Sequence, residues 1–152
     1  MTVQTEYERY IGTAYAGQLA DGFNPTLRKS LISEGVVIYG RTVSQGTADD
    51  QAVQGGATNI LGVALRDLNA ENFIGSIAKQ YPDEKVMAVI EEGYVYVNIT
   101  NTGAKGAAIY SVDADGTIAV GTAGAGQTQL TGSKLDETVA SAGIARIYLA
   151  KL

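Results

Sequence analysis

The chain has 152 residues, the usual size of one domain and enough to bury a modest core. It carries 16 acidic and 11 basic residues, a net charge of -5, and neither histidine nor cysteine. Without imidazole or thiol, the commonest general base, the thiolate nucleophile and the usual structural zinc ligands are excluded. We therefore expect no catalytic residue, no cofactor and no metal site.

The distribution of charge and hydropathy limits the partners. Basic residues are scattered singly, apart from the adjacent pair Arg28 and Lys29, so the sequence predicts no nucleic-acid partner. No apolar run approaches the roughly 18 to 20 residues that span a bilayer, and the N-terminus MTVQTEYERY lacks the basic and apolar parts of a signal peptide. We expect a protein that is made in a cytoplasm and has no membrane partner.

The first thirty residues show no sustained helical or strand period. We interpret residues 1–30 as an N-terminal arm and leader, and residues 31–152 as a single β domain. The aromatic residues of this first segment are Tyr7, Tyr10, Tyr15 and Phe23. Aromatic side chains bury large areas when they meet a surface, which favours an extended arm that reaches a neighbouring subunit. An irregular leader packed on its own domain is the alternative.

Short apolar runs rich in β-branched residues follow, bounded by glycine or polar residues, and predict strands. In chain order these runs are residues 35–43, 60–65, 85–91, 94–100, 107–112, 117–120 and 143–152. Residues 127–132 are expected to be extended, and residues 69–80 to form a long loop. Turn signals about every ten residues, without a helical period, predict an antiparallel all-β sandwich or barrel.

The stretch EEGYVYVNIT, residues 91–100, has the clearest alternation. Glu91, Glu92 and Gly93 are interpreted as a hairpin turn between two strands. The residues on one side of the second strand, Val95, Val97 and Ile99, are expected to face the core. Those on the other side, Tyr94 and Tyr96, either pack across strands on an exposed face or contact another subunit, and we favour the contact.

Three local matches to functional motifs favour structural interpretations. The loop 121–126 has the glycine spacing of a phosphate-binding loop, but Gln127 replaces the lysine and no helix follows, which favours a flexible turn. Ser76 and Lys79 have the spacing of a Ser-Lys enzyme without its companion motifs. Residues 113–116, Asp-Ala-Asp-Gly, open like a calcium loop but lack its closing glutamate, which favours a hairpin turn.

Five segments of residues 16–149 follow one another in a characteristic order: AGQLADGFNPTLRKSLISEGVVIYGRTVSQG, NILGVALRD, KVMAVIEEGYVYVNI, KGAAIYSVDADGTI and GIARIYL. In this succession the sequence resembles the cement (head decoration) proteins of tailed bacteriophages, whose synthesis takes place in the host cytoplasm. The resemblance implies a jelly-roll-like β-sandwich that binds the outside of an icosahedral head and bridges neighbouring capsomers as a dimer or trimer. The implied partners are the major capsid protein and other copies of the chain, and the implied place is the outer capsid surface of the virion. The loop at 121–132 departs from the pattern.

A non-enzymatic structural virion protein is therefore the expected function. The candidate interface residues are Tyr7, Tyr10, Tyr15, Phe23, Tyr94 and Tyr96. A ligand-binding β-sandwich, carbohydrate-binding or adhesin-like, would also use surface tyrosine, although sugar platforms more often include tryptophan, which the chain lacks. An enzyme that uses only carboxylates would draw on Glu91, Glu92 and Asp83, but adjacent glutamates on a turn are more simply a solvated hairpin tip.

Overall fold

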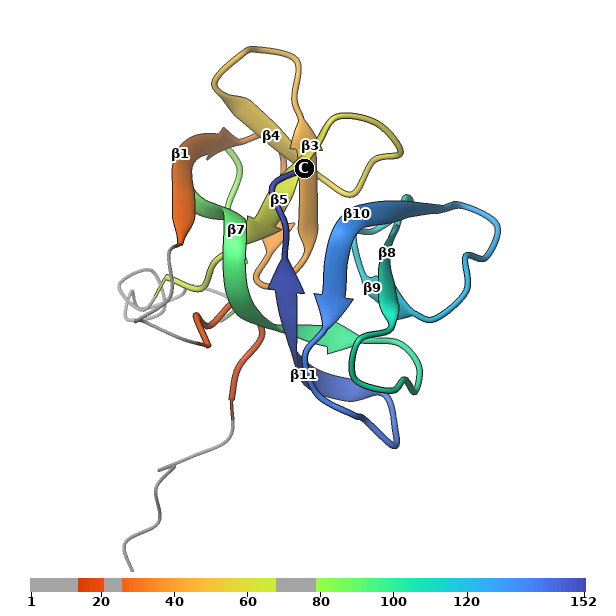
Figure 1. Ribbon diagram of the computed structural model, residues 1–152. Helices are drawn as coiled ribbons and strands as arrows, with labels where there is room; N and C mark the ends of the chain where they lie inside the picture. Colours follow the sequence, from red (N-terminus) through yellow and green to blue (C-terminus); the bar gives the residue numbers. More distant parts are fainter. Residues whose placement is uncertain (1–13, 21–25, 68–78) are drawn as a thin grey trace, which may run out of the picture.

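The computed structural model describes residues 14–20, 26–67 and 79–152. Within these ranges it is built of strands and turns, so the predicted all-β class is confirmed (Figure 1). The strands are β1 (Leu27–Ser33), β2 (Val37–Ile38), β3 (Thr42–Gln45), β4 (Gln51–Gln54), β5 (Ile60–Ala64), β6 (Gln80–Tyr81), β7 (Val86–Ile99), β8 (Ala108–Val112), β9 (Ile118–Val120), β10 (Gln127–Leu135) and β11 (Gly143–Leu149). In this part of the chain, no helix is long and apolar enough to cross a membrane.

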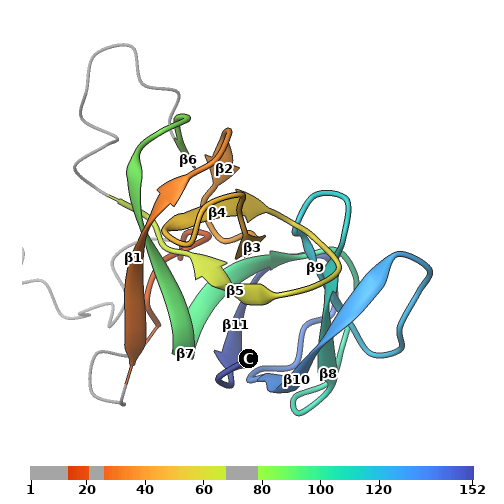
Figure 2. The same cartoon turned by 90° about the horizontal axis from the view of Figure 1, so that it is seen from above.

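Strand β7 belongs to two closed rings of strands. The first ring contains β1, β4, β3, β5 and β7, and the β1–β7 pairing closes it. The second contains β7, β11, β10, β8 and β9, and a single parallel pair between Ile99 and Ile118 closes it. Figure 2 shows the first ring on one side and β8, β9 and β10 on the other, with β7 running across. The predicted barrel is therefore confirmed.

The details of the pairing differ from the prediction. Most neighbouring strands are antiparallel, but the β1–β4 pair of the first ring and the β7–β9 pair of the second are parallel, so each ring is mixed. Strands β2 and β6 form a separate two-stranded sheet. The strand order does not show the jelly-roll arrangement that the resemblance implied.

The two faces of β7 serve two different cores. In its first half, Met87 and Val89 belong to the core of the first ring, together with Leu31 and Val43. Ile90 points to the opposite side and joins the second core. The later β7 residues of that second core are Val95, Val97 and Ile99, all of them at most 3% exposed. The predicted core side of this stretch is confirmed.

The predicted hairpin at residues 91–93 is wrong, because β7 runs through it as one strand of 14 residues. Leu27 pairs with Glu92 and Arg28 with Ile90, which leaves Glu91 as the extra residue of a β-bulge. An extra residue reverses the alternation of side chains along a strand. The bulge therefore places the odd-numbered residues Val95, Val97 and Ile99 on the same side of β7 as the even-numbered Ile90.

Other boundaries follow from close backbone contacts. Four of the other predicted strands are confirmed, namely β5, β8, β9 and β11. The sequence did not predict β1, β4 and β6. The predicted strand 35–43 is divided into β2 and β3 at Gly40, which has a positive φ of 76°. A Cβ at Gly40 would lie 2.8 Å from the backbone nitrogen of Gly17, so this crossing requires glycine. Of the predicted loop 69–80, residues 69–78 lie outside the described residues.

Residues 14–20 pack on their own domain. They run along the edge of β7 opposite β11, where the Gly17 amide donates to the Tyr96 carbonyl at 2.7 Å and the Tyr96 amide donates to the Gln18 carbonyl at 2.9 Å. Leu19 forms an antiparallel bridge with Val95. This part of the N-terminal segment therefore follows the leader alternative, and residues 1–13 and 21–25 lie outside the described residues.

Candidate interaction surface

Strands β7 and β11 place tyrosine and arginine side chains on one outward face. Their antiparallel register sets Tyr94 opposite Tyr148 and Tyr96 opposite Arg146. The alternate residues of β11, such as Ile147, are fully buried on the other side. We call the four outward residues, Tyr94, Tyr96, Arg146 and Tyr148, the tyrosine face. All four are half-buried.

The Tyr94 and Tyr148 rings pack against each other, with centroids 5.1 Å apart and planes tilted by 49°. The Tyr148 hydroxyl donates to the Glu92 carboxylate at 3.4 Å. Burial, and then the nearby negative charge of Glu92, raises the pKa of Tyr148, so this hydroxyl keeps its proton at neutral pH. The pair thus presents a stacked apolar surface with a hydroxyl at its edge.

Arg146 is held as a fixed cation beside the rings. Its Nε lies 2.6 Å from Oδ2 of Asp136, and its backbone amide donates to Glu137 at 2.6 Å. The contact with Asp136 is an ion pair. Burial alone would lower the pKa of Arg146, but the contacts with Asp136, together with the nearby Tyr96 and Glu137, outweigh burial and raise the pKa. The guanidinium is therefore charged and positioned before any partner arrives.

The structure brings together only two of the predicted interface residues. Tyr94 and Tyr96 lie on the tyrosine face, each with a cross-strand neighbour. Tyr15 is 50% exposed and stacks instead under Arg66, whose guanidinium carbon lies 4.0 Å from the ring centroid. The remaining three residues lie outside the described part of the chain: Tyr7, Tyr10 and Phe23.

The sequence interpretation missed Arg146, Tyr148 and Glu92 as members or neighbours of this face. The alternation in GIARIYL already places Arg146 and Tyr148 on one side of a strand. What the sequence lacked was the pairing of β11 with β7, which joins the two alternating rows into one surface.

Tyrosine content alone overstates the surface that is available for contact. Tyr39 and Tyr81 are 3% and 2% exposed and pack edge to face at 4.9 Å in the first core. The Tyr81 hydroxyl donates to the Leu65 carbonyl at 2.7 Å. Burial raises the pKa of Tyr81 to about 12. These two tyrosines stabilise the barrel and cannot reach a partner.

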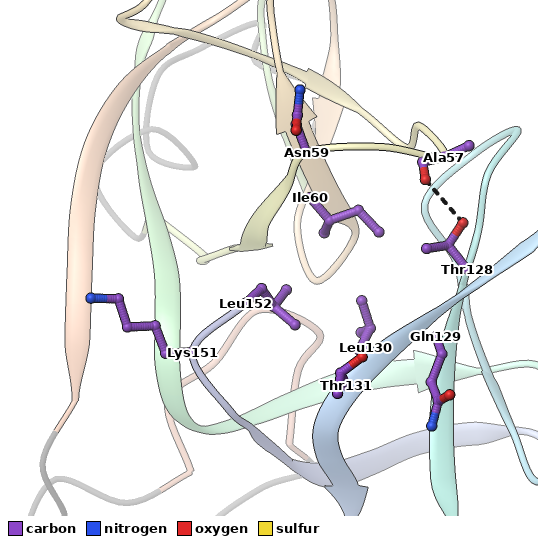
Figure 3. Close-up of a pocket in the computed structure, with 9 residues that line it drawn as sticks. All are labelled: Ala57, Asn59, Ile60, Thr128, Gln129, Leu130, Thr131, Lys151 and Leu152. Carbon is purple, nitrogen blue, oxygen red and sulfur yellow. Dashed lines mark hydrogen bonds between the residues drawn. The ribbon is translucent and has the colours of Figure 1, made fainter.

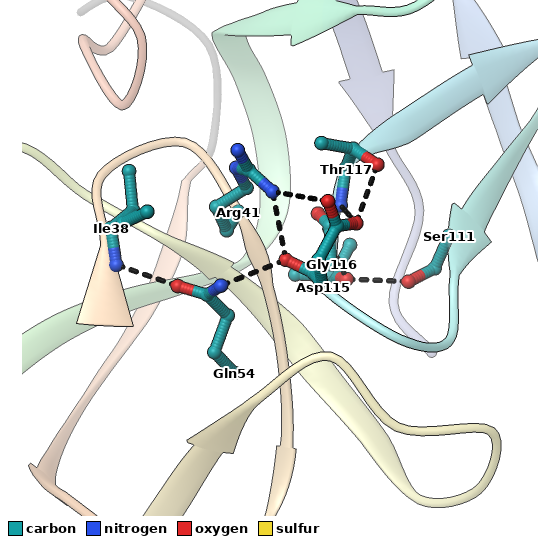
Figure 4. Close-up of polar contacts among 8 residues, drawn as sticks. Ile38, Arg41, Gln54, Ser111, Asp115, Gly116 and Thr117 are labelled. Atoms are coloured by element: carbon teal, nitrogen blue, oxygen red, sulfur yellow. Dashed lines mark hydrogen bonds and ion pairs between the residues drawn. The ribbon is translucent and has the colours of Figure 1, made fainter. Parts of the chain in front are cut away.

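The calcium-like sequence at 113–116 is a turn between β8 and β9, as predicted (Figure 4). One oxygen of Asp115 accepts from the amide and hydroxyl of Thr117 at 2.9 and 2.6 Å, and the other lies 2.9 Å from Arg41. Asp113 accepts from Thr128 at 2.7 Å. Both carboxylates are thus bound within the chain, and the described residues contain no group of three metal-ligating side chains.

This turn also fastens the second ring to the first. The Thr42 amide donates to the Gly116 carbonyl at 2.9 Å, and the Thr42 hydroxyl bonds the hydroxyl of Ser111. The Gln54 side chain donates to the Asp115 carbonyl at 2.9 Å and accepts from the Ile38 amide at 2.8 Å (Figure 4). We call these contacts the inter-ring latch.

A shallow pocket of about 340 Å³ lies between the start of β5, β10 and the C-terminal end (Figure 3). Its lining consists of Ala57, Asn59, Ile60, Thr128, Gln129, Leu130, Thr131, Lys151 and Leu152. Among these, Lys151 is the only charged side chain, so the pocket brings together no acid and base for catalysis.

The remaining enzyme-like patterns do not assemble. Glu91 lies in the β7 bulge and not on a hairpin tip, while Asp83 accepts from the Gly35 amide at 2.7 Å, before β7 begins. The side chain of Gln127 accepts from the Gly124 amide at 2.8 Å, which closes the glycine loop on itself as a turn. Ser76 lies outside the described residues.

The described residues thus form two closed rings of strands, with the tyrosine face on the outer side of β7 and β11. The family model for the structural cement protein (E217 gp24/Pam3 gp6) matches residues 3–150. The chain therefore belongs to the phage structural cement proteins. As a member of this family it is a non-enzymatic component of the virion capsid.

One solved structure supports the fold. A chain of the capsid of Myoviridae Phage XM1 matches with a TM-score of 0.73 and 17% identity, covering 99% of each chain. The head fiber gp8.5 N base of bacteriophage phi29 matches with a TM-score of 0.45 and 12% identity, over 84% of this chain and 96% of that one. The curated proteins gave no match.

Proposed function

We propose that this cement protein binds the outer surface of an icosahedral head and stabilises it by bridging neighbouring capsomers. The observation that carries the proposal is the tyrosine face, where Tyr94 stacks on Tyr148 beside the charge of Arg146. Tyrosine and arginine are the residue types that most often dominate protein interfaces. They lie here on two hydrogen-bonded strands, so little conformational entropy is lost when a partner binds.

The partners in this proposal are the major capsid protein and further copies of the chain in a dimer or trimer. The tyrosine face contacts the shell. Residues 1–13, with Tyr7 and Tyr10, extend to a neighbouring subunit as the arm, and Tyr15 marks where this arm leaves the barrel. Phe23, which follows residues 14–20 in the chain, is a further candidate for the same interface. Many copies acting together reinforce a shell even when each contact is weak.

The test is decoration of heads that lack this protein, measured by co-sedimentation and electron microscopy. The double variant Y94A/Y148A is expected to lose roughly tenfold or more in affinity, because truncating two interface tyrosines removes at least about 1.4 kcal/mol. Y110A is the matched control, because Tyr110 is a half-buried tyrosine on β8, outside the tyrosine face.

The result is interpretable only if both variants stay folded, which thermal unfolding establishes. R146Q provides a second test that leaves the stacked rings in place. Two results would overturn the assignment of this face. One is an electron-microscopy structure in which the tyrosine face of the bound protein points to solvent. The other is an unchanged affinity of both Y94A/Y148A and R146Q for heads.

A further inference from the structure

The first half of β1 has a strand neighbour on one side only. Residues 27–32 of β1 pair with β7. On its other side β1 pairs with β4 only at Ile32 and Ser33. Figure 2 shows β1 at the rim of the first ring, beside β7. Residues 27–31 therefore form an open sheet edge within the part of the chain that the structure describes.

The direction of the backbone groups at this edge follows from the ladder. The Ser33 amide donates to Lys85, on the β7 side, whereas the Ile32 amide donates to Asp50, on the β4 side. Because these directions alternate along a strand, the amide and carbonyl groups of Arg28 and Ser30 point away from β7. Among the described residues, no strand lies there to receive them.

The side chains of this edge are exposed on both sides of the strand. All four residues from Leu27 to Ser30 are exposed, although Leu31 is only 2% exposed. Arg28 and Lys29 are the one adjacent basic pair of an acidic chain. As neighbours on a strand they point to opposite faces. An incoming strand with two consecutive carboxylates would therefore meet a positive charge on each face.

We propose that this edge of β1 receives an extended, acidic segment of a partner protein as an added β-strand. The backbone groups of Arg28 and Ser30 provide the hydrogen bonds, and Arg28 and Lys29 select for carboxylate side chains. The inference rests on the proposed function for the place of the partner, which is the phage head.

A second copy of the chain fits this edge poorly. Two β1 edges paired across a two-fold axis would bring the Arg28 and Lys29 side chains of both copies together across a strand spacing of about 4.8 Å. Like charges at this distance destabilise a strand pair. The same basic residues therefore oppose self-association and attract an acidic partner.

The experiment uses the full chain and amide hydrogen exchange, with two ten-residue peptides of alternating threonine and valine as probes. One carries Glu-Glu at its centre and the other Lys-Lys. We expect the Glu-Glu peptide to slow exchange at Arg28 and Ser30 by roughly tenfold or more, and the Lys-Lys peptide to leave it unchanged. The R28E/K29E variant should reverse this preference. Slow exchange at both amides in the free protein, or equal effects of the two peptides, would overturn the inference.

A second experiment measures decoration of heads that lack this protein. R28E/K29E should decorate them at least about tenfold more weakly, whereas K79E/K151E, at two exposed lysines away from the tyrosine face, changes the net charge equally and should not. Decoration by R28E/K29E at wild-type affinity would overturn the proposed partner. If the wild-type chain itself did not decorate heads, the proposed function would fail, and the peptide experiment would still decide whether the edge binds an acidic strand.

Discussion

Val89 and Ile90 are consecutive residues of β7, and both are fully buried, yet their side chains enter different cores. One strand therefore couples the packing of the two rings, because losing β7 would open both at once. The inter-ring latch adds a second connection, from Thr42 and Gln54 to residues 111–116, and the Arg41–Asp115 ion pair lies beside it.

Substitutions at these two positions test the coupling. V89A and I90A are each expected to lower the free energy of unfolding by about 2 to 4 kcal/mol, through the lost burial and the cavity left behind. Urea denaturation followed by far-UV circular dichroism and by tyrosine fluorescence should show one shared transition in each variant. Two separate transitions would show that the rings unfold independently.

Gly62 of β5 is expected to tolerate no side chain. A Cβ at this position would lie 2.0 Å from the carbonyl oxygen of Ile90, on the strand paired with β5. Because the clash is with backbone, G62A should cost about 3 kcal/mol or more. G106A is the control, since Gly106 also has a positive φ but open space around it, and it should cost about 1 kcal/mol. Thermal or urea unfolding measures both, and equal losses would contradict the steric explanation.

The latch predicts an acid-dependent contribution from Asp115. Partial burial alone would raise the pKa of Asp115, but hydrogen bonds from Thr117 and Arg41 outweigh it and lower the pKa below its ordinary value of 3.8. A carboxyl whose folded pKa is lowered stabilises the protein above pH 3.8, and this stabilisation is lost as the pH falls through the folded pKa.

D115N should therefore lower stability at pH 7 by about 1 kcal/mol or less, because the side chain is 49% exposed and solvent screens its ion pair. The difference from wild type should shrink as the pH falls below 3.8. D49N, in the exposed turn between β3 and β4, is the matched control. Urea unfolding between pH 2.5 and 7 gives the comparison, and a gap that does not change with pH would disprove this role of the carboxylate.

Two truncations distinguish the role of the arm, residues 1–13, from that of the leader, residues 14–20. Removing residues 1–13 should change the free energy of unfolding by less than about 0.5 kcal/mol but weaken head decoration or self-association. Removing residues 1–20 should also lower stability, by about 2 to 3 kcal/mol, because the hydrogen bonds of residues 17–20 to β7 are lost. Unchanged decoration by the shorter truncation would refute the arm hypothesis.

Local pattern predicted the buried side of β7 but not its continuity. The alternation of Val95, Val97 and Ile99 correctly indicates the core face. Glu-Glu-Gly between two apolar runs fits a hairpin turn and a bulge equally well, because both change the phase of the alternation. The choice depends on pairing with β1, whose sequence LRKSLIS is polar and exposed at its start and gives no strand period of its own.

The candidate site was predictable only in part for a similar reason. Tyr94 was recognisable as an outward residue of a strand, and Tyr148 lies in an equally regular run. That the two rings stack depends on the register between β7 and β11, which is a long-range property. The position of the Arg146 guanidinium depends on its ion pair with Asp136, which directly follows β10, ten residues earlier in the chain.

The shared strand has a mechanical consequence. A force that pulls the two rings apart acts along the covalent backbone of β7, and no interface between separate domains lies in its path. To yield, the molecule must break strand ladders along β7 and the contacts of the 113–117 turn together. Tension applied at the tyrosine face and at the β1 edge would therefore be carried from one attachment to the other by a single continuous chain segment.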